Sequence, residues 1–368
     1  MKKAISIVLA LAMVFALAAC AGGGTTTTDP TPAPPTTDPT PGVSAPVVDL
    51  PDGDLAWNPD NIREQTFILA HGMAETSQVG MQYHQFALAV EALSEGKMIV
   101  QERIAGTLVA DTETLDAIMD DTIDFAHSMG SFVSGTISDI SPLTIAGYYG
   151  GDNWLGFAED THGIISDIYA EYGIKYMGAL YQGNSVIVCT ERQVQVPADV
   201  SGLAFRASGT WVARTVQAWG GAATTIGLAD LSDAFSKKTV QGTATGLNIV
   251  VPFKIYEVAE YITFTTISEG FAALIMSGTR WEKLNEDEQA LLTEAAKIFV
   301  QNAHDLALEL SVDYVATIEN AGLNEIYYLS DEEQIEFVDL AQALYVDMAS
   351  EVGDKGNELI RILQEING

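Results

Sequence analysis

The chain has 368 residues, of which 50 are acidic and 17 are basic, giving a formal net charge of −33. So large a negative excess argues against nucleic acid as a partner, because binding nucleic acid requires a positive surface that this composition does not supply. It equally disfavours docking on anionic lipid head groups, and it makes a single cation inside a pocket useful for attracting an acidic ligand.

The N-terminus has the pattern of a secretory leader. Lys2 and Lys3 precede the apolar run Ile5–Ala16, which is too short for a membrane span. The run ends in Leu17-Ala18-Ala19-Cys20, which indicates a lipoprotein signal peptide at residues 1–19 with Cys20 as the lipidated first residue. The alternative is an ordinary signal peptide with an incidental Cys. We therefore expect an extracytoplasmic protein, lipid-anchored in the periplasm or on the outer face of the cell membrane.

Residues 20–61 form a predicted linker rich in Thr and Pro. Nine of the twelve prolines of the chain lie between Pro30 and Pro59, and such a composition stays extended and solvated. Only Cys189 remains in the rest of the chain, so no intramolecular disulfide is expected. About 300 residues are left for the fold, which is enough for two lobes.

Strand and helix patterns alternate through the first half of the fold. The sequence predicts strands at Thr66–Ala70, Met98–Ile104 and Ile123–Ala126, with a helix from Gln78 and another that Asp111 caps and that runs through Thr122. This order predicts a parallel sheet with right-handed crossovers.

The pattern continues with a helix at Trp154–Glu171 and a strand at Ile174–Leu180, and it then restarts after Gly183, which favours a second sheet. The elements predicted after Gly183 are a strand at Leu203–Arg206, a helix at Thr210–Trp219, a strand at Ala223–Ile226, a helix at Ala229–Ser236 and a strand at Gly246–Val251.

A long helix is predicted near the C-terminus. Asn285 and Glu288 have capping-box spacing, and no Gly or Pro follows until Gly322. One helix of about 35 residues would be roughly 50 Å long, enough to span two lobes; two helices that bend near Asp313 are the alternative. Further helices are predicted after Ser330 and at Asn357–Glu365.

Arg206 is the main candidate for a binding residue. It ends an apolar strand, and a guanidinium removed from water needs an acidic partner. The partner is either the carboxylate of a ligand, held bidentately, or a distant Asp or Glu of the chain.

Three segments carry a resemblance to a known family. They are Leu69-Ala70-His71-Gly72 with the run to Asp124-Phe125, then Pro197-Ala198-Asp199-Val200-Ser201-Gly202-Leu203-Ala204-Phe205-Arg206, then Val240-Gln241-Gly242 with Pro252–Tyr256 and Gly322–Ile366. From about Phe67 onward the chain resembles the DctP-type solute-binding proteins of tripartite ATP-independent periplasmic (TRAP) transporters.

The resemblance implies an α/β fold of two lobes with crossing hinge strands and a long helix that spans both. We place the first lobe at residues 62–183 plus 272–316 and the second at 184–271 plus 317–368. It also implies a monomer that captures a small organic acid by lobe closure and delivers it to the membrane subunits of a TRAP permease.

In the family, the position of Arg206 holds the substrate carboxylate. A second family Arg falls at Val186 here, a frequent Asp-Gly is Gln241-Gly242, and a ligand-binding Asn falls near Thr245, with Asn248 three residues on. These departures favour a monocarboxylate over a ligand that needs two Arg residues.

Further candidates follow the ends of the predicted strands. They are His71, Glu75, His127, Ser128, Trp211 and Leu228. Trp211 could equally pack its helix, and His127 could equally be a hydrogen-bonded loop residue.

No pattern for catalysis is present. The sequence has no G-x-S-x-G elbow, no H-E-x-x-H pair and no phosphate loop, and its five His residues are scattered. We therefore predict no catalytic residue, no metal and no cofactor. The rival functions are a surface lipoprotein that senses the same ligand for a membrane receptor, and a purely structural lipoprotein.

Overall fold

The computed structural model describes residues 55–147, 153–267 and 270–367, which all belong to one compact unit. Cys20, the predicted leader and nearly all of the predicted linker lie outside the described residues. Within the described ranges, no helix is both long enough and apolar enough to cross a membrane.

The first sheet has five strands in the order β2-β1-β3-β10-β4. They are β1 (Gln65–Ala70), β2 (Met98–Arg103), β3 (Phe125–Met129), β4 (Ile174–Leu180) and β10 (Ala272–Ser277). β1 runs parallel to β2 and β3, but β10 is antiparallel to β3 and β4. The sheet is therefore mixed, and the prediction of a parallel sheet is wrong at β10, which enters from a later part of the chain.

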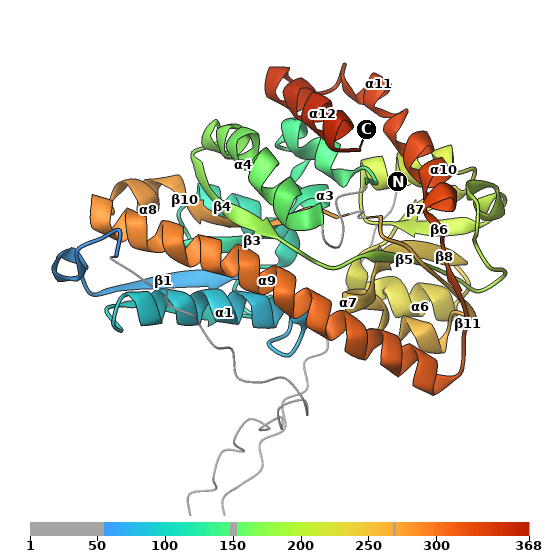
Figure 1. The fold of residues 1–368 in the computed structure, drawn as a ribbon, viewed down its shortest axis with the longest axis horizontal. Coiled ribbons are helices and arrows are strands. Elements are labelled where there is room, and N and C mark those ends of the chain that lie inside the picture. The colour runs from blue at the N-terminus through green and yellow to red at the C-terminus, as the bar shows by residue number, and fades with distance from the viewer. Residues whose placement is uncertain (1–54, 148–152, 268–269, 368) are drawn as a thin grey trace, which may run out of the picture. The chain divides into compact units, whose positions relative to one another are not determined.

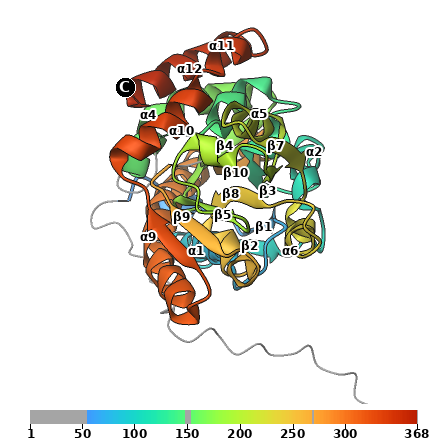
Figure 2. The same ribbon diagram turned by 90° about the vertical axis from the view of Figure 1, so that its right-hand side faces the viewer.

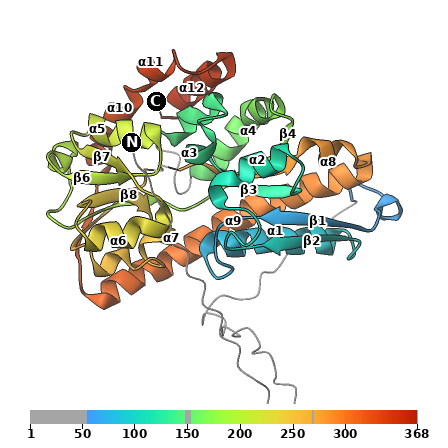
Figure 3. The same cartoon turned by 180° about the vertical axis from the view of Figure 1, so that it is seen from behind.

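Helices cover both faces of the first sheet. They are α1 (Gln78–Leu93), α2 (Thr114–Met119), α3 (Gly130–Val133), α4 (Trp154–Ala170) and α8 (Gly278–Glu282). Successive residues of a strand point to opposite faces: Leu274 and Met276 of β10 pack with α1, whereas Ala273 and Ile275 belong to the core under α4. Figure 1 shows α1 and α4 on opposite sides of this sheet, and Figure 3 shows α2 on the side away from α1.

The second sheet has six strands in the order β11-β9-β5-β8-β6-β7. They are β5 (Ser185–Cys189), β6 (Ala204–Ala207), β7 (Ala222–Thr225), β8 (Gly242–Gly246), β9 (Tyr261–Phe264) and β11 (Glu325–Tyr328). The helices α6 (Leu231–Ser236) and α7 (Leu247–Val250) pack on one face, and α5 (Thr210–Ala218) and α10 (Asp331–Gln342) on the other (Figure 2). Two sheets, each at the centre of a lobe, confirm the predicted fold class.

Two strand connections and one helix join the sheets. β4 of the first sheet leads into β5 of the second, and β9 of the second leads back into β10 of the first. The helix α9 (Glu286–Ala321) is a single helix of 36 residues, opened by the predicted capping box and ended by Gly322 at a positive φ of 62°. Its first turns pack with α1 and its last turns with α7, so it passes from one lobe to the other (Figure 1). The alternative of two separate helices that meet near Asp313 is therefore wrong.

The chain closes with α11 (Tyr345–Met348) and α12 (Asp354–Asn367). The prediction assigned residues 317–368 to the second lobe, but α12 packs against α4 and the turn Ser138–Thr144. The strand predicted at Gly246–Val251 is wrong. β8 ends at Gly246, and the apolar residues that follow form α7, because a short apolar run alone does not distinguish a strand from a buried helix.

Candidate ligand-binding site

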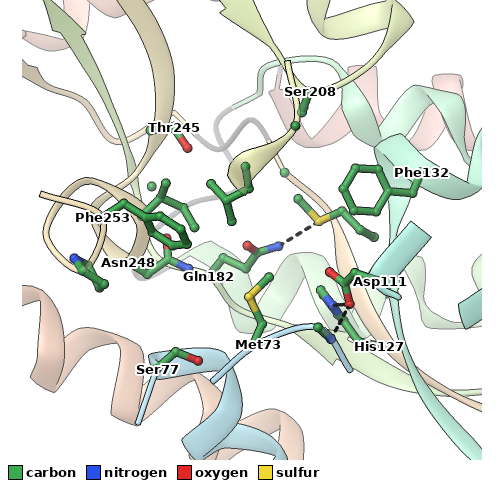
Figure 4. A pocket seen from close by; sticks show the side chains of 18 of the residues that line it. Met73, Ser77, Asp111, His127, Phe132, Gln182, Ser208, Thr245, Asn248 and Phe253 are labelled. Carbon is green, nitrogen blue, oxygen red and sulfur yellow. Dashed lines mark hydrogen bonds and ion pairs between the residues drawn. The ribbon is translucent and has the colours of Figure 1, made fainter. Parts of the chain in front are cut away.

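A pocket of about 810 Å³ lies between the two sheets, at the ends of their strands. Its lining comes from the residues that follow β1, β2 and β3 in the first lobe and from the ends of β6, β7 and β8 in the second (Figure 4). In α/β sheets, ligands bind outside the carboxyl ends of the strands, so this is the expected place for a site.

Arg206 is the cation of the pocket. It lies on β6 between Thr224 of β7 and Thr243 of β8, and only 8% of its surface is exposed. Its Nε donates a hydrogen bond of 2.9 Å to the carbonyl oxygen of Ile226, which fixes the plane of the guanidinium. Among the described residues that line the pocket, Arg206 is the only Lys or Arg.

Asp111 is the acidic group on the opposite lobe. Its Oδ1 accepts a hydrogen bond of 2.9 Å from the backbone N–H of Gly72 and one of 3.1 Å from Nδ1 of His127 (Figure 4). Burial alone would raise the pKa of Asp111, but the neighbouring imidazole and these hydrogen bonds outweigh it and lower the pKa to about 2. Gly72 allows this contact because a Cβ there would lie 2.8 Å from the Cβ of Asp111.

Most of the remaining wall is apolar. Side chains of both lobes contribute, namely Met73, Met129, Phe132, Val212, Leu228, Ile249, Pro252 and Phe253. A mainly apolar cavity with a few fixed polar groups is typical of a site for a small organic molecule. Among the described residues, no group of three or more His, Cys, Asp or Glu side chains is arranged to hold a metal ion.

Comparison with known families decides the class of protein. The model of the family "bacterial extracellular solute-binding protein, family 7" (DctP) matches residues 69–351. The chain belongs to this family. Family 7 consists of binding proteins, which confirms the prediction that the chain is not an enzyme.

Individual members of family 7 resemble the chain at low identity. The ectoine-binding periplasmic protein TeaA of Halomonas elongata is 22% identical over 57% of this chain, and the match spans 62% of TeaA. The C4-dicarboxylate-binding protein DctB of Bacillus subtilis is 21% identical over 82% of this chain and 86% of its own. A TRAP periplasmic solute-binding protein of Marinobacter aquaeolei has the same fold, with a TM-score of 0.76 and 18% identity over 83% of this chain and all of that one. The chain is thus a TRAP solute-binding protein of family 7, as the resemblance implied.

Five of the residues predicted for the site line the pocket. They are Arg206, His127, Leu228, Thr245 and Asn248. Thr245 and Asn248 come from β8 and α7, so both belong to the second lobe, as Arg206 does.

Four other predicted residues do not line the pocket, namely His71, Glu75, Ser128 and Trp211. His71 is fully buried behind it, stacked on Tyr83 at 5.2 Å, and burial together with His127 lowers the pKa of His71 to about 4. The hydroxyl of Ser128 is hydrogen-bonded to Tyr169 at 2.7 Å, and Glu75 is exposed to solvent.

Trp211 is a packing residue. It is buried in the core of the second lobe, and the guanidinium of Arg214 lies 4.0 Å from its ring. Val186 packs in the core on the other face of the second sheet, with α6 and α7, whereas the adjacent Ser185 lines the pocket. Cys20 lies outside the described residues.

Several lining residues were missed from the sequence. Asp111 was predicted to cap a helix, and this is wrong: the turn has Ala110 at its N-cap with no side-chain cap, and the carboxylate of Asp111 bonds Gly72 and His127 instead. Gln182 lies in the connection from β4 to β5, where its Nε2 contacts Sδ of Met129 at 3.3 Å. The only sequence feature that could have placed Asp111 in the pocket is its position after a strand and a loop. No sequence feature indicated that Gln182 lines the pocket.

Proposed function

We propose that this protein captures a small organic acid with one carboxylate in the pocket between its lobes and delivers it to the membrane subunits of a TRAP permease. Arg206 holds the carboxylate. The lobes close on the ligand as contacts from both sides form, and the permease supplies the driving force from an ion gradient.

The observation that carries this proposal is the placement of Arg206. Its guanidinium is almost fully buried at an otherwise mainly apolar pocket, and its Nε is held by the carbonyl of Ile226. A bidentate contact with a carboxylate would therefore use the two Nη atoms, and such planar pairing is what Arg provides and Lys does not.

The lining supports a ligand with one carboxylate. No second Lys or Arg is found among the described lining residues, and the side chain at position 186 packs in the core. The relatives are named for ectoine and for C4-dicarboxylates, all of which contain a carboxylate. A dicarboxylate would leave its second charge against an apolar wall, at a cost of several kcal/mol.

The cellular location, membrane attachment and oligomeric state of the protein are part of the same proposal. Cys20 carries the lipid that attaches the protein to the outer face of the cell membrane or in the periplasm, the linker holds the folded part away from the membrane, and the protein acts as a monomer. The pattern of residues 1–20 supports the anchor, and the family supports the permease as partner.

A thermal-shift screen tests the carboxylate directly. Small organic acids are compared with their carboxamides, on wild type, Arg206→Ala and Arg214→Ala, which removes the same charge from a surface position that pairs with Glu351. We expect an acid to raise the melting temperature of wild type and Arg214→Ala, and neither the amide nor Arg206→Ala to give the shift. Equal stabilisation of Arg206→Ala would overturn the proposed clamp.

A further inference from the structure

We propose that the ligand is a zwitterion whose protonated nitrogen, bearing N–H groups, is bound at Asp111 while its carboxylate is bound at Arg206. This inference rests on the proposed function and adds the second charge of the ligand. It assigns a binding role to an acidic side chain of the first lobe that faces the pocket.

The first argument is the geometry of Asp111. Both hydrogen bonds that the described residues make to this side chain go to Oδ1, from Gly72 N–H and His127 Nδ1. Oδ2 accepts no hydrogen bond from the part of the chain that the structure describes, and the side chain is 17% exposed at the pocket. Gly72 and His127 thus fix the carboxylate and leave one oxygen for a donor from the ligand.

The second argument is charge. Within the described residues, no Lys or Arg forms an ion pair with Asp111, and the imidazole of His127, its hydrogen-bond partner, carries a charge only when it is protonated. A partly buried carboxylate is costly without a cation, and a closing pocket would raise this cost further as water leaves. A ligand ammonium or amidinium group supplies the missing charge and the missing donor together.

The third argument comes from two other buried atoms of the lining. Nε2 of His127 and Oδ1 of Asn248 are buried without a hydrogen-bond partner in the described structure. Since an ionised carboxylate only accepts, Nδ1 of His127 must donate to Asp111, and Nε2 of a neutral ring is then an acceptor. Buried polar atoms are rarely left unpaired. Both atoms, like Oδ2 of Asp111, lack a donor, so the pocket favours a ligand with N–H groups.

The two opposite charges lie on different lobes, so a ligand that binds both of them favours closure of the lobes. Arg206 is on β6 of the second sheet, while Asp111 follows β2 of the first. A zwitterion contacts both charged groups only when it bridges the lobes, whereas a simple acid contacts one. The ligand with both charges therefore gains more from closure, which is the differential interaction that a population shift requires.

The test uses matched ligands. A ladder of ω-amino acids from β-alanine to ε-aminocaproate, together with leucine and ectoine, is compared with the deaminated acid of the same carbon skeleton where one exists. Dissociation constants are measured by calorimetric titration on wild type, Asp111→Asn and the control Glu75→Gln. Asn keeps the size of Asp111 and an acceptor for Gly72, and Glu75 is an exposed acid of the neighbouring loop outside the lining.

We expect the best zwitterion to bind wild type at least about tenfold more tightly than its deaminated analogue, because removing one member of a buried charge pair costs at least that factor. Asp111→Asn should abolish this preference, and Glu75→Gln should retain it. An N-trimethylated analogue, which has the charge but no N–H group, should bind more weakly than the parent amine.

The failures of the two proposals can be told apart. If simple acids bind in an Arg206-dependent way and zwitterions bind no better, or if Asp111→Asn keeps the preference, the inference is overturned and the proposed function stands. If no carboxylate binds, or if binding does not depend on Arg206, the proposed function fails as well.

Discussion

His71 predicts how the stability of the protein depends on pH. The imidazole is fully buried next to the pocket. Burial, followed by the neighbouring His127, lowers the pKa of His71 from 6.5 to about 4. The unfolded chain therefore binds a proton near pH 5 that the folded chain does not, and stability falls as the pH decreases from about 6.5 to about 4.

The size of this effect follows from the two pKa values. At about pH 5 the unfolded state gains roughly 2 kcal/mol over the folded state from this one group, and at about pH 7.5 it gains almost nothing. His71→Phe keeps an aromatic ring against Tyr83 and removes the titration. Any packing cost of the larger ring is the same at both pH values, so it cancels from the difference.

The assay is urea unfolding of wild type and His71→Phe at about pH 7.5 and pH 5. The variant should lose roughly 2 kcal/mol less than wild type between the two pH values. The depressed pKa of Asp111 acts in the same direction but only below about pH 4, because its ordinary value is 3.8, so it does not overlap with this window. An identical loss in wild type and variant would refute the reasoning.

Two further predictions concern the folding stability of the protein and its attachment to the membrane. The side chain of Glu288 is 0% exposed and accepts hydrogen bonds from Arg63, Gln65 and the N–H of Asn285, so Glu288→Ala should lower the free energy of unfolding by about 3 kcal/mol. Chemical denaturation checks this, and the adjacent Asp287→Ala, which loses more exposed hydrogen bonds, should cost under about 1 kcal/mol. Cys20→Ala should move the protein from the membrane fraction to the soluble fraction, since several acyl chains hold a lipoprotein firmly; wild type found wholly in the soluble fraction would rule out the anchor.

Long, strongly periodic segments were predictable from the sequence. The capping box at Asn285 and the absence of Gly or Pro before Gly322 correctly predicted the helix α9, and the strand predicted at Ile174–Leu180 has the bounds of β4. Such elements carry their signal locally, in spacing and in caps.

Elements whose partners are distant in sequence were not predictable in the same way. β5, β9, β10 and β11 are runs of four to six residues that pair with strands far along the chain, and only those pairings identify them. Asp111 has the residue type of a helix cap, but Gly72 and His127, 39 and 16 residues away, compete successfully for its carboxylate. The same holds for the site: Arg206 follows a recognisable motif, whereas Gln182 and Phe253 reach the pocket only through the arrangement of the lobes.

The central claim is that Arg206 binds the carboxylate of the ligand. Its most direct test is calorimetric titration of the acid found in the screen, on wild type, Arg206→Lys, Arg206→Ala and the surface control Arg214→Ala. Truncating one member of a buried charge pair costs about 2 to 5 kcal/mol, so Arg206→Ala should bind at least about thirtyfold more weakly. Arg206→Lys, which keeps the charge but not the planar fork, should lie in between, and Arg214→Ala should match wild type. Folded Arg206→Ala that binds the acid as tightly as wild type would contradict the account.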